Sequence, residues 1–168
     1  SSIGGLMPLI LPGNVASALP TGFDVANSCR FDTNAYMGRT PGTASGSGTK
    51  ATFSCWIKPS FIPDSDTALL TIGDSSSTSV FNVGWSGGGL WIGVLDSAAY
   101  AGSVSTTRKY RDQSAWMHIC VTYDTTQATS TDRIKITING TRETTLTYNT
   151  FPSQNHANGA LTATTGYT

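Results

Sequence analysis

Apolar and polar residues alternate with a period of two wherever this chain shows a strong hydropathy pattern. Residues 133–139 are the clearest example, because three isoleucines fall on one face and charged or polar side chains on the other. Residues 52–58 and 116–123 alternate in the same way. Shorter apolar windows bounded by glycine, serine or aspartate lie at residues 68–72, 79–85 and 90–95. Since successive side chains of a strand point to opposite faces, these windows predict strands with one buried face.

Glycine-containing turns join the predicted strands into hairpins. Asn139-Gly140 is the strongest turn signal, because both residues tolerate the positive φ of a type I′ turn. Residues 141–146 are therefore expected to return antiparallel to residues 133–139, and the three glycines at 87–89 to close a second hairpin. Many short strands with tight turns predict an all-β fold, an antiparallel β-sandwich of the jelly-roll kind.

An apolar stretch near the start of the chain does not follow this alternation. It has no preceding basic region, and two prolines interrupt a run too short to cross a bilayer, so neither a signal peptide nor membrane insertion is expected. Residues 1–22 are predicted to form an extended arm that docks on its own body or on a neighbouring subunit, because its leucines gain from burial. The apolar side chains of this predicted assembly arm are Leu6, Met7, Leu9, Ile10 and Leu11.

Charge is scarce and balanced, which limits the classes of partner. Charged residues make up 12% of the 168 residues, ten of each sign. Without a net charge or a basic stripe there is little electrostatic attraction for nucleic acid or anionic lipid, so neither is an expected partner. The length fits one domain, placed at residues 23–155, with residues 156–168 as a C-terminal extension or exchanged strand.

The three cysteines, Cys29, Cys55 and Cys120, contain no C-x-x-C pair. An odd count leaves at least one thiol unpaired, and free buried thiols are the favoured interpretation. A Cys55–Cys120 disulfide across neighbouring strands is the alternative.

Several separate motifs resemble one family. Residues 28–32 (SCRFD), 36–41 (YMGRTP) and 52–58 (TFSCWIK) resemble the opening strands of laminin-G-like, concanavalin A-like jelly rolls. Residues 116–124 (WMHICVTYD) and 134–140 (IKITING) resemble that family's later long strand and hairpin. The resemblance covers residues 28–155 and implies the sandwich fold, whereas the same fold hosts lectins, hydrolases and structural modules.

A narrower resemblance points to bacteriophage proteins. The sequences RTP, RDQSAW, DTTQAT and FPSQN, at residues 39–41, 111–116, 124–129 and 151–155, are similar to laminin-G-like modules of marine phages found in tail-fibre and other virion proteins. Such modules usually continue into further strands after the last of these motifs. Either those strands are missing here, or the segment around residues 160–165 substitutes for one and leaves an edge open to pairing with another chain.

The chain lacks the residues of a glycoside hydrolase. Retaining enzymes place two carboxyl groups at about 5 Å, but Glu143 is the only glutamate and stands beside Arg142 on a hairpin strand expected to face outward. Asp64 and Asp66 fall in a sequence typical of a turn. Residues 84–88 (GWSGG) match the letters of a nucleophile elbow, yet a strand rather than a helix follows them. No catalytic residue is predicted, and the protein is not expected to be an enzyme.

Metal ligands are sparse as well. His118 and Cys120 share a predicted strand face, but two ligands without nearby carboxylates rarely hold a metal, so a hydrogen-bonded strand histidine is the favoured interpretation. No cofactor and no metal site is predicted. Calcium at the loop rim, as laminin-G-like domains often hold it, is the alternative, with no defined ligand set. The aspartates predicted to lie in loops are Asp64, Asp66, Asp74, Asp124 and Asp132.

Aromatic residues carry the prediction of a ligand site. A tryptophan presented on a sheet can stack on the apolar face of a pyranose, with amide groups supplying hydrogen bonds. Trp91, Tyr100 and Asn82 are the candidate glycan-binding residues. For Trp91 the favoured interpretation is that it packs in the core between the sheets or in a subunit contact, with glycan binding as the alternative, while Trp56 is expected to be structural.

Two functions of different classes follow. The first is a non-enzymatic virion structural protein, a tail-fibre, head-fibre or capsid-decorating module, made in the host cytoplasm and located in the virion. It would work as a homo-oligomer with other virion proteins as partners. The second is a lectin-like module that binds a host-surface glycan.

Overall fold

The computed structural model describes residues 29–31, 35–39, 46–60, 67–73 and 78–163. The chain divides into two compact units, residues 1–37 and 38–168. In the first unit the described residues form no helix or strand and are exposed to solvent. The predicted arm at residues 1–22 lies outside the described residues. Among the helices of the described part of the chain, none has the length and apolar character needed to span a membrane.

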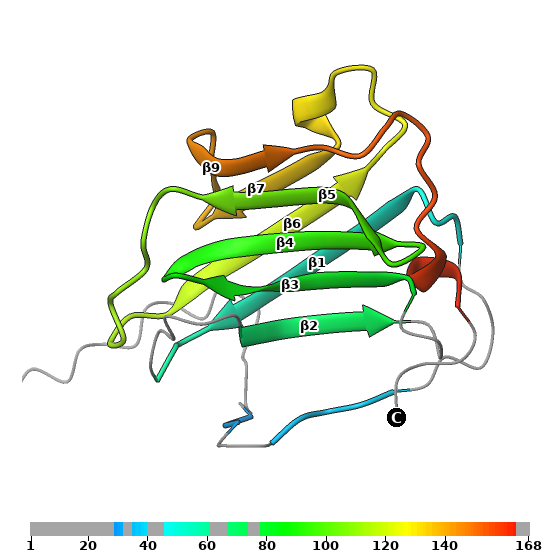
Figure 1. The fold of residues 1–168 in the computed structure, drawn as a ribbon. Helices are drawn as coiled ribbons and strands as arrows, with labels where there is room; N and C mark the ends of the chain where they lie inside the picture. Colours follow the sequence, from blue (N-terminus) through cyan, green and yellow to red (C-terminus); the bar gives the residue numbers. More distant parts are fainter. Residues whose placement is uncertain (1–28, 32–34, 40–45, 61–66, 74–77, 164–168) are drawn as a thin grey trace, which may run out of the picture. The chain divides into compact units, whose positions relative to one another are not determined.

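The second unit is built from two antiparallel sheets (Figure 1). The four-stranded sheet has the order β1 (Lys50–Ile57), β6 (Met117–Asp124), β7 (Ile134–Ile138), β8 (Thr141–Arg142). The five-stranded sheet has the order β2 (Thr67–Gly73), β3 (Val80–Ser86), β4 (Gly89–Asp96), β5 (Ala99–Thr106), β9 (Leu146–Thr150). Two short 3₁₀ helices complete the described elements, η1 (Ser130–Asp132) and η2 (Gly159–Thr162). The predicted all-β antiparallel sandwich is confirmed.

The core lies between the inward faces of the two sheets. Buried and partly exposed positions alternate residue by residue along β6 and β7, as their sequence patterns predict. The five-stranded sheet contributes Phe81, Val83, Trp85, Leu90, Ile92, Val94 and Val104, and the four-stranded sheet Met117, Ile119, Val121, Tyr123, Ile134, Ile136 and Ile138. Burial of one such side chain contributes roughly 1.5–3 kcal/mol, so this layer is the main source of the sandwich's stability.

Both predicted hairpin turns are present. Asn139 and Gly140 have φ values of 50° and 80°, and Gly87 and Gly88 have 52° and 77°, as type I′ turns require. A third such turn was not predicted, because it contains no glycine: Ser97 and Ala98 connect β4 to β5 with φ values of 51° and 60°. The carboxylate before this turn accepts a hydrogen bond from the Ser97 amide, which helps to hold the left-handed backbone.

The prediction of a return strand over residues 141–146 is correct for Thr141 and Arg142 and wrong for the residues after them. β8 ends at Arg142, and the last bond of the hairpin is donated by the Glu143 amide to the Ile136 carbonyl. Residues 141–145 offer no apolar side chain to the core, whereas Leu146 packs against it. The chain therefore leaves this sheet, and β9 pairs with β5 in the other.

β5 lies in the interior of the five-stranded sheet although its sequence predicts no strand. It pairs with β4 on one side and β9 on the other. Its sequence, AYAGSVST, places a single large aliphatic residue, Val104, in the core. Small side chains on the outward face weaken the hydropathy alternation that marks the other strands.

The segment after β9 packs against its own sandwich. Asn158 is fully buried, donates through Nδ2 to the Leu95 carbonyl at 2.7 Å and accepts at Oδ1 from the Ala160 amide. The His156 carbonyl accepts a hydrogen bond from Thr125 Oγ1 at 2.7 Å. Residues 159–162 form η2 rather than a strand, so this part of the expected C-terminal extension belongs to the fold, and residues 164–168 lie outside the described part.

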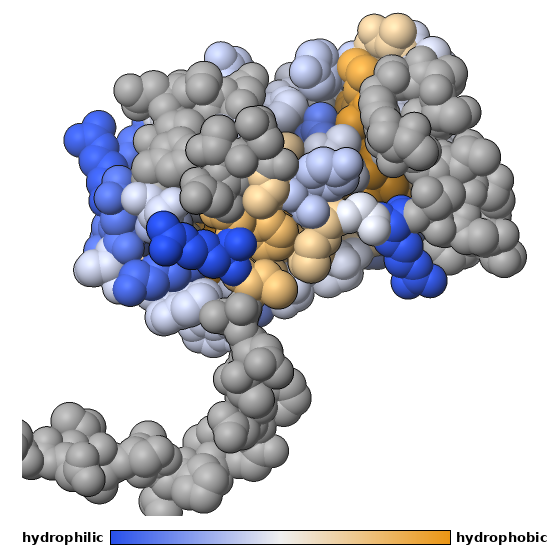
Figure 2. Space-filling view, turned by 90° about the horizontal axis from the view of Figure 1, so that it is seen from below, coloured by the Kyte–Doolittle hydropathy of each residue, from blue (hydrophilic) through white to orange (hydrophobic). Residues whose placement is uncertain are grey.

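β1 and β2 are edge strands of the two sheets, and their inward side chains are only partly buried. Figure 2 views the molecule from this side and shows apolar atoms reaching the surface. The partly buried apolar residues of these two strands are Ala51, Phe53, Cys55, Ile57, Leu69, Leu70 and Ile72. This contrasts with the fully buried inward side chains of the neighbouring strands β3 and β6.

All three cysteines are free, which confirms unpaired thiols, but none is fully buried. Cys29 is exposed, while Cys55 and Cys120 are partly buried. Cys55 pairs with Ile119, and Cys120 with Ser54, so the two thiols lie on opposite faces of the sheet. That placement rules out the alternative of a disulfide between them. Burial raises the pKa of the Cys55 thiol.

Candidate functional site

The outward face of the five-stranded sheet presents a tryptophan held in a defined position. Trp91 points outward from β4, and its indole lies across Gly93 on the same strand. A Cβ atom on Gly93 would come within 2.5 Å of the indole Cη2, so the ring fits there only because this residue is glycine. The indole Nε1 donates a hydrogen bond to Ser103 Oγ at 3.1 Å. Trp91 is therefore half-buried against the sheet and does not pack in the core between the sheets.

The structure places the other two predicted residues near this indole. The Tyr100 ring meets the Trp91 ring edge-on, with centroids 6.3 Å apart, and is 63% exposed. Asn82 pairs with Gly93 across β3 and β4, so it stands beside the glycine that the indole covers. Asn82 Oδ1 is shielded from solvent and has no hydrogen-bond partner within the described residues.

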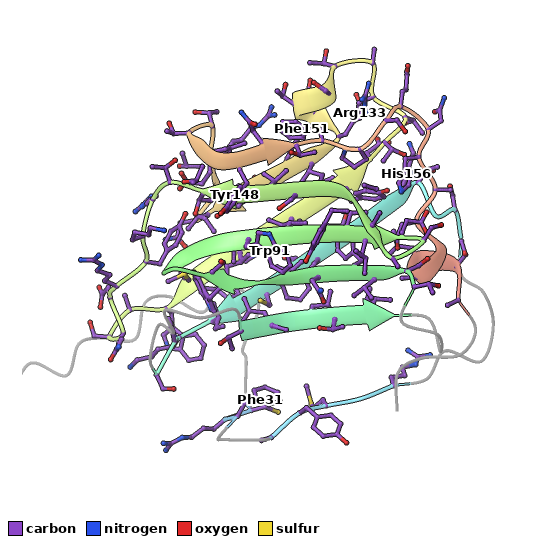
Figure 3. All side chains as sticks on the ribbon, in the orientation of Figure 1. Phe31, Trp91, Arg133, Tyr148, Phe151 and His156 are labelled. Carbon is purple, nitrogen blue, oxygen red and sulfur yellow. The ribbon has the colours of Figure 1, made fainter. Side chains whose placement is uncertain are left out.

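Tyr148 is a further aromatic residue of this face that the sequence did not predict. Ser105 pairs with Trp91 on one side and with Tyr148 on the other, so the three residues form one row across β4, β5 and β9. Two strand spacings separate Trp91 from Tyr148, about 10 Å. Tyr148 is 58% exposed, and Figure 3 labels it together with Trp91 on the five-stranded sheet. Its place depends on β9 changing sheets, which no local signal predicted.

Together these residues form a face suited to stacking. Aromatic rings stand around a floor of small side chains, Gly93, Ser103 and Ser105. The apolar face of a sugar ring packs against an aromatic ring, and hydroxyl or amide groups nearby fix its orientation. A preformed indole loses little freedom when it binds, because the Ser103 hydrogen bond and the sheet already hold it.

Each carboxylate in the described part of the chain accepts a hydrogen bond from a side chain of the protein. Glu143 was expected to face outward, but its side chain is only 13% exposed and accepts hydrogen bonds from Tyr110 Oη at 3.0 Å and Arg108 Nη1 at 3.2 Å. It turns inward because β8 ends before it. Burial and, next, the Glu143 carboxylate raise the pKa of the Tyr110 hydroxyl. This carboxylate acts as a structural acceptor between two loops.

The remaining described acids show the same kind of engagement. Asp96 accepts from Ser79, Asp112 from Ser114, Asp124 from Thr126 and Gln127, and Asp132 from Arg142. Hydrogen bonds from Thr126 and then Gln127 hold the pKa of Asp124 well below its usual range. Asp64, Asp66 and Asp74, predicted turn residues, lie outside the described part of the chain. The supposed elbow at residues 84–88 is the hairpin between β3 and β4, as predicted.

His118 is a hydrogen-bonded strand histidine, as predicted. Its Nε2 lies 2.8 Å from Ser54 Oγ on the neighbouring strand. Within the described residues no group of three or more histidine, cysteine or acidic side chains could hold a metal ion.

The two antiparallel sheets define a jelly-roll class of all-β proteins, and the comparison with known families agrees. The model of the concanavalin A-like lectin/glucanases superfamily, in its laminin G form, matches residues 31–167. The chain belongs to this superfamily. No curated protein matches the chain.

Proposed function

We propose that this protein is a non-catalytic carbohydrate-binding module whose ligand stacks on Trp91. The observation that carries the proposal is the indole held across Gly93 by the Ser103 hydrogen bond, on the outward face of the five-stranded sheet. Tyr100 and Tyr148 flank this ring and stay exposed, which suits an extended ligand with more than one sugar unit. A superfamily that includes lectins supports the same assignment.

The absence of catalysis is part of the proposal, because the superfamily also includes glucanases. It is supported by the chain's single glutamate, whose carboxylate is occupied by Tyr110 and Arg108. A hydrolase would need one carboxyl group free to protonate the leaving oxygen and a second to act as nucleophile or base.

A glycan array probed with the full chain tests the proposal. Trp91→Ala should lower retention at least tenfold, because a buried aromatic contact contributes about 1.5–3 kcal/mol and 1.4 kcal/mol corresponds to a factor of ten. Tyr148→Ala should lower it less. Thr129→Ala, an exposed position in the loop after β6, serves as the control. Equal retention of wild type and Trp91→Ala would refute the site, and release of reducing sugar from a retained glycan would refute the non-catalytic assignment.

We infer the virion role from sequence alone, as a second and compatible function. It is supported by the resemblance to phage modules and by the apolar segment around Leu6 and Leu11, which favours subunit association. Deleting residues 1–20 should leave the sandwich folded but reduce the mass of the assembly by light scattering. An unchanged mass would count against an assembly arm.

A further inference from the structure

Two exposed tryptophans lie at the other sheet, one in β1 and one directly before β6. Trp56 is the second-last residue of β1, and Trp116 directly precedes β6. Their side chains are 65% and 54% exposed, which makes them more accessible than Trp91 or Trp85. Trp56 was expected to be structural, but its side chain points outward and is not part of the core. Exposure of an indole to water is unfavourable, so two exposed indoles on one face indicate a binding surface.

The strand register brings the two indoles together. Trp56 pairs with His118 across β1 and β6. Trp116 lies two residues before His118, so strand alternation puts it on the same outward face. It precedes Met117, the last paired residue of β6 opposite Ile57, so it lies one position beyond the ladder and diagonal to Trp56.

The imidazole beside Trp56 is held in place. His118 Nε2 lies 2.8 Å from Ser54 Oγ, and its amide donates to Asn139 Oδ1 at 2.8 Å. The Trp56 and His118 rings are 5.2 Å apart and inclined at 45°. The indole of Trp56 therefore packs at one side against a fixed imidazole.

The surroundings of this pair favour a sugar over a protein partner. The other outward positions of β1 and β6 are Lys50, Thr52, Ser54, Cys120, Thr122 and Asp124. None is a large aliphatic residue, whereas a protein-docking surface needs a contiguous apolar patch. Indoles set among hydroxyl and imidazole groups match a pyranose, which presents an apolar face and a rim of hydroxyls.

We propose that Trp56 and Trp116, with His118 and Ser54, form a second carbohydrate-binding site that takes pyranose units of a polysaccharide. This site goes beyond the function proposed above and does not depend on Trp91. The two sites lie on the outward faces of opposite sheets, whose backbones are about 10 Å apart, and they point away from each other. One polysaccharide chain does not pass through both without wrapping around the sandwich. A single molecule of this protein therefore bridges two polysaccharide chains.

Cross-linking tests this proposal with the full chain. Wild type, Trp91→Ala, the double variant Trp56→Ala/Trp116→Ala and the control Thr129→Ala, an exposed loop position, are each mixed with soluble mixed-linkage β-glucan, xylan, galactan and a bacterial capsular polysaccharide. Retention is measured by affinity electrophoresis and cross-linking by turbidity. Wild type and control should bind at least one polysaccharide and raise turbidity. Each site variant should still bind but cause no turbidity, because one remaining site cannot join two polysaccharide chains.

The outcomes separate the two sites. Retention and turbidity of the double variant equal to wild type would overturn the second site and leave the Trp91 site standing. A loss confined to the double variant, with Trp91→Ala unchanged, would support the second site and overturn the first. A wild type that binds none of the polysaccharides would overturn both. A fall in molecular mass of the double variant by light scattering would show a subunit contact instead and overturn the proposal. The circular dichroism spectrum and the Tm of each variant should match those of wild type, which excludes unfolding as the cause of lost binding. This match is expected because substitutions at exposed positions usually change stability little.

Discussion

The sharpest test of the Trp91 platform is a single methyl group at Gly93. Gly93→Ala places a Cβ atom 2.5 Å from the indole Cη2, about 1 Å closer than ordinary van der Waals contact between carbon atoms. The ring must therefore move, which breaks its hydrogen bond to Ser103. The substitution leaves every other group of the proposed site in place.

The size of the effect follows from three contributions. Losing the hydrogen bond costs about 1 kcal/mol, and forcing the indole off its rotamer costs about 1 kcal/mol. Replacing glycine by alanine inside a strand stabilises the folded state by about 0.5–1 kcal/mol, because the unfolded chain has less conformational freedom to lose. Gly93→Ala should therefore lower the free energy of unfolding by about 1 kcal/mol, the balance of these terms. In a Trp91→Ala background there is no indole to displace, so only the stabilisation from the reduced freedom of the unfolded chain remains. Gly93→Ala should then be neutral or stabilising.

A double-mutant cycle measures this coupling. The free energy of unfolding of wild type, both single variants and the double variant is obtained from urea denaturation, with an expected coupling of about 2 kcal/mol, the sum of the two lost terms. Glycan retention should fall in Gly93→Ala nearly as far as in Trp91→Ala. A coupling near zero, or full retention by Gly93→Ala, would refute the account of a ring positioned by the glycine.

Two further predictions concern the fold around the site. Asn158→Ala should lower the free energy of unfolding by about 1–3 kcal/mol, because the Leu95 carbonyl and the Ala160 amide lose the partner that this buried side chain provides. A change under 0.5 kcal/mol in urea denaturation, the size usual for surface positions, would contradict this. Asp124→Asn should lower Tm at pH 7, since the carboxylate accepts from Thr126 and pairs with Lys50. A lowered pKa stabilises the folded state above the unfolded value near about 4 and stops doing so as the pH falls through the folded value. The Tm difference from wild type should therefore shrink below about pH 4, and a difference that grows there would refute the assignment.

Local pattern was sufficient to predict most of the sandwich. The isoleucines of β7 and the alternating residues of β6 define an inward face without reference to the rest of the chain, because side-chain direction in a strand has a strict period of two. The turn at Asn139-Gly140 was equally local, since its positive φ values suit these two residue types. The strand β5 and the glycine-free turn at Ser97-Ala98 gave weaker local signals, because neither has the residue types that mark such elements.

What lies side by side on each face was decided by the tertiary structure. Trp91 and Tyr100 were predicted as candidate ligand residues, but the glycine under the indole and the serine that holds it come from the pairing of β4 with β5. Tyr148 joins them only because β9 pairs with β5 in the five-stranded sheet. We attribute this pairing to Leu146, which packs against the core there. Trp56 was expected to be structural, yet its indole is exposed, because alternation shows which residues share a face but not which face meets the other sheet. The chain's own sequence therefore determined most of its strands, its glycine-containing turns and its single glutamate, because these depend on residue types and on neighbours along the chain. The three-dimensional fold decided which aromatic rings reach solvent together, because that depends on contacts between residues far apart in sequence.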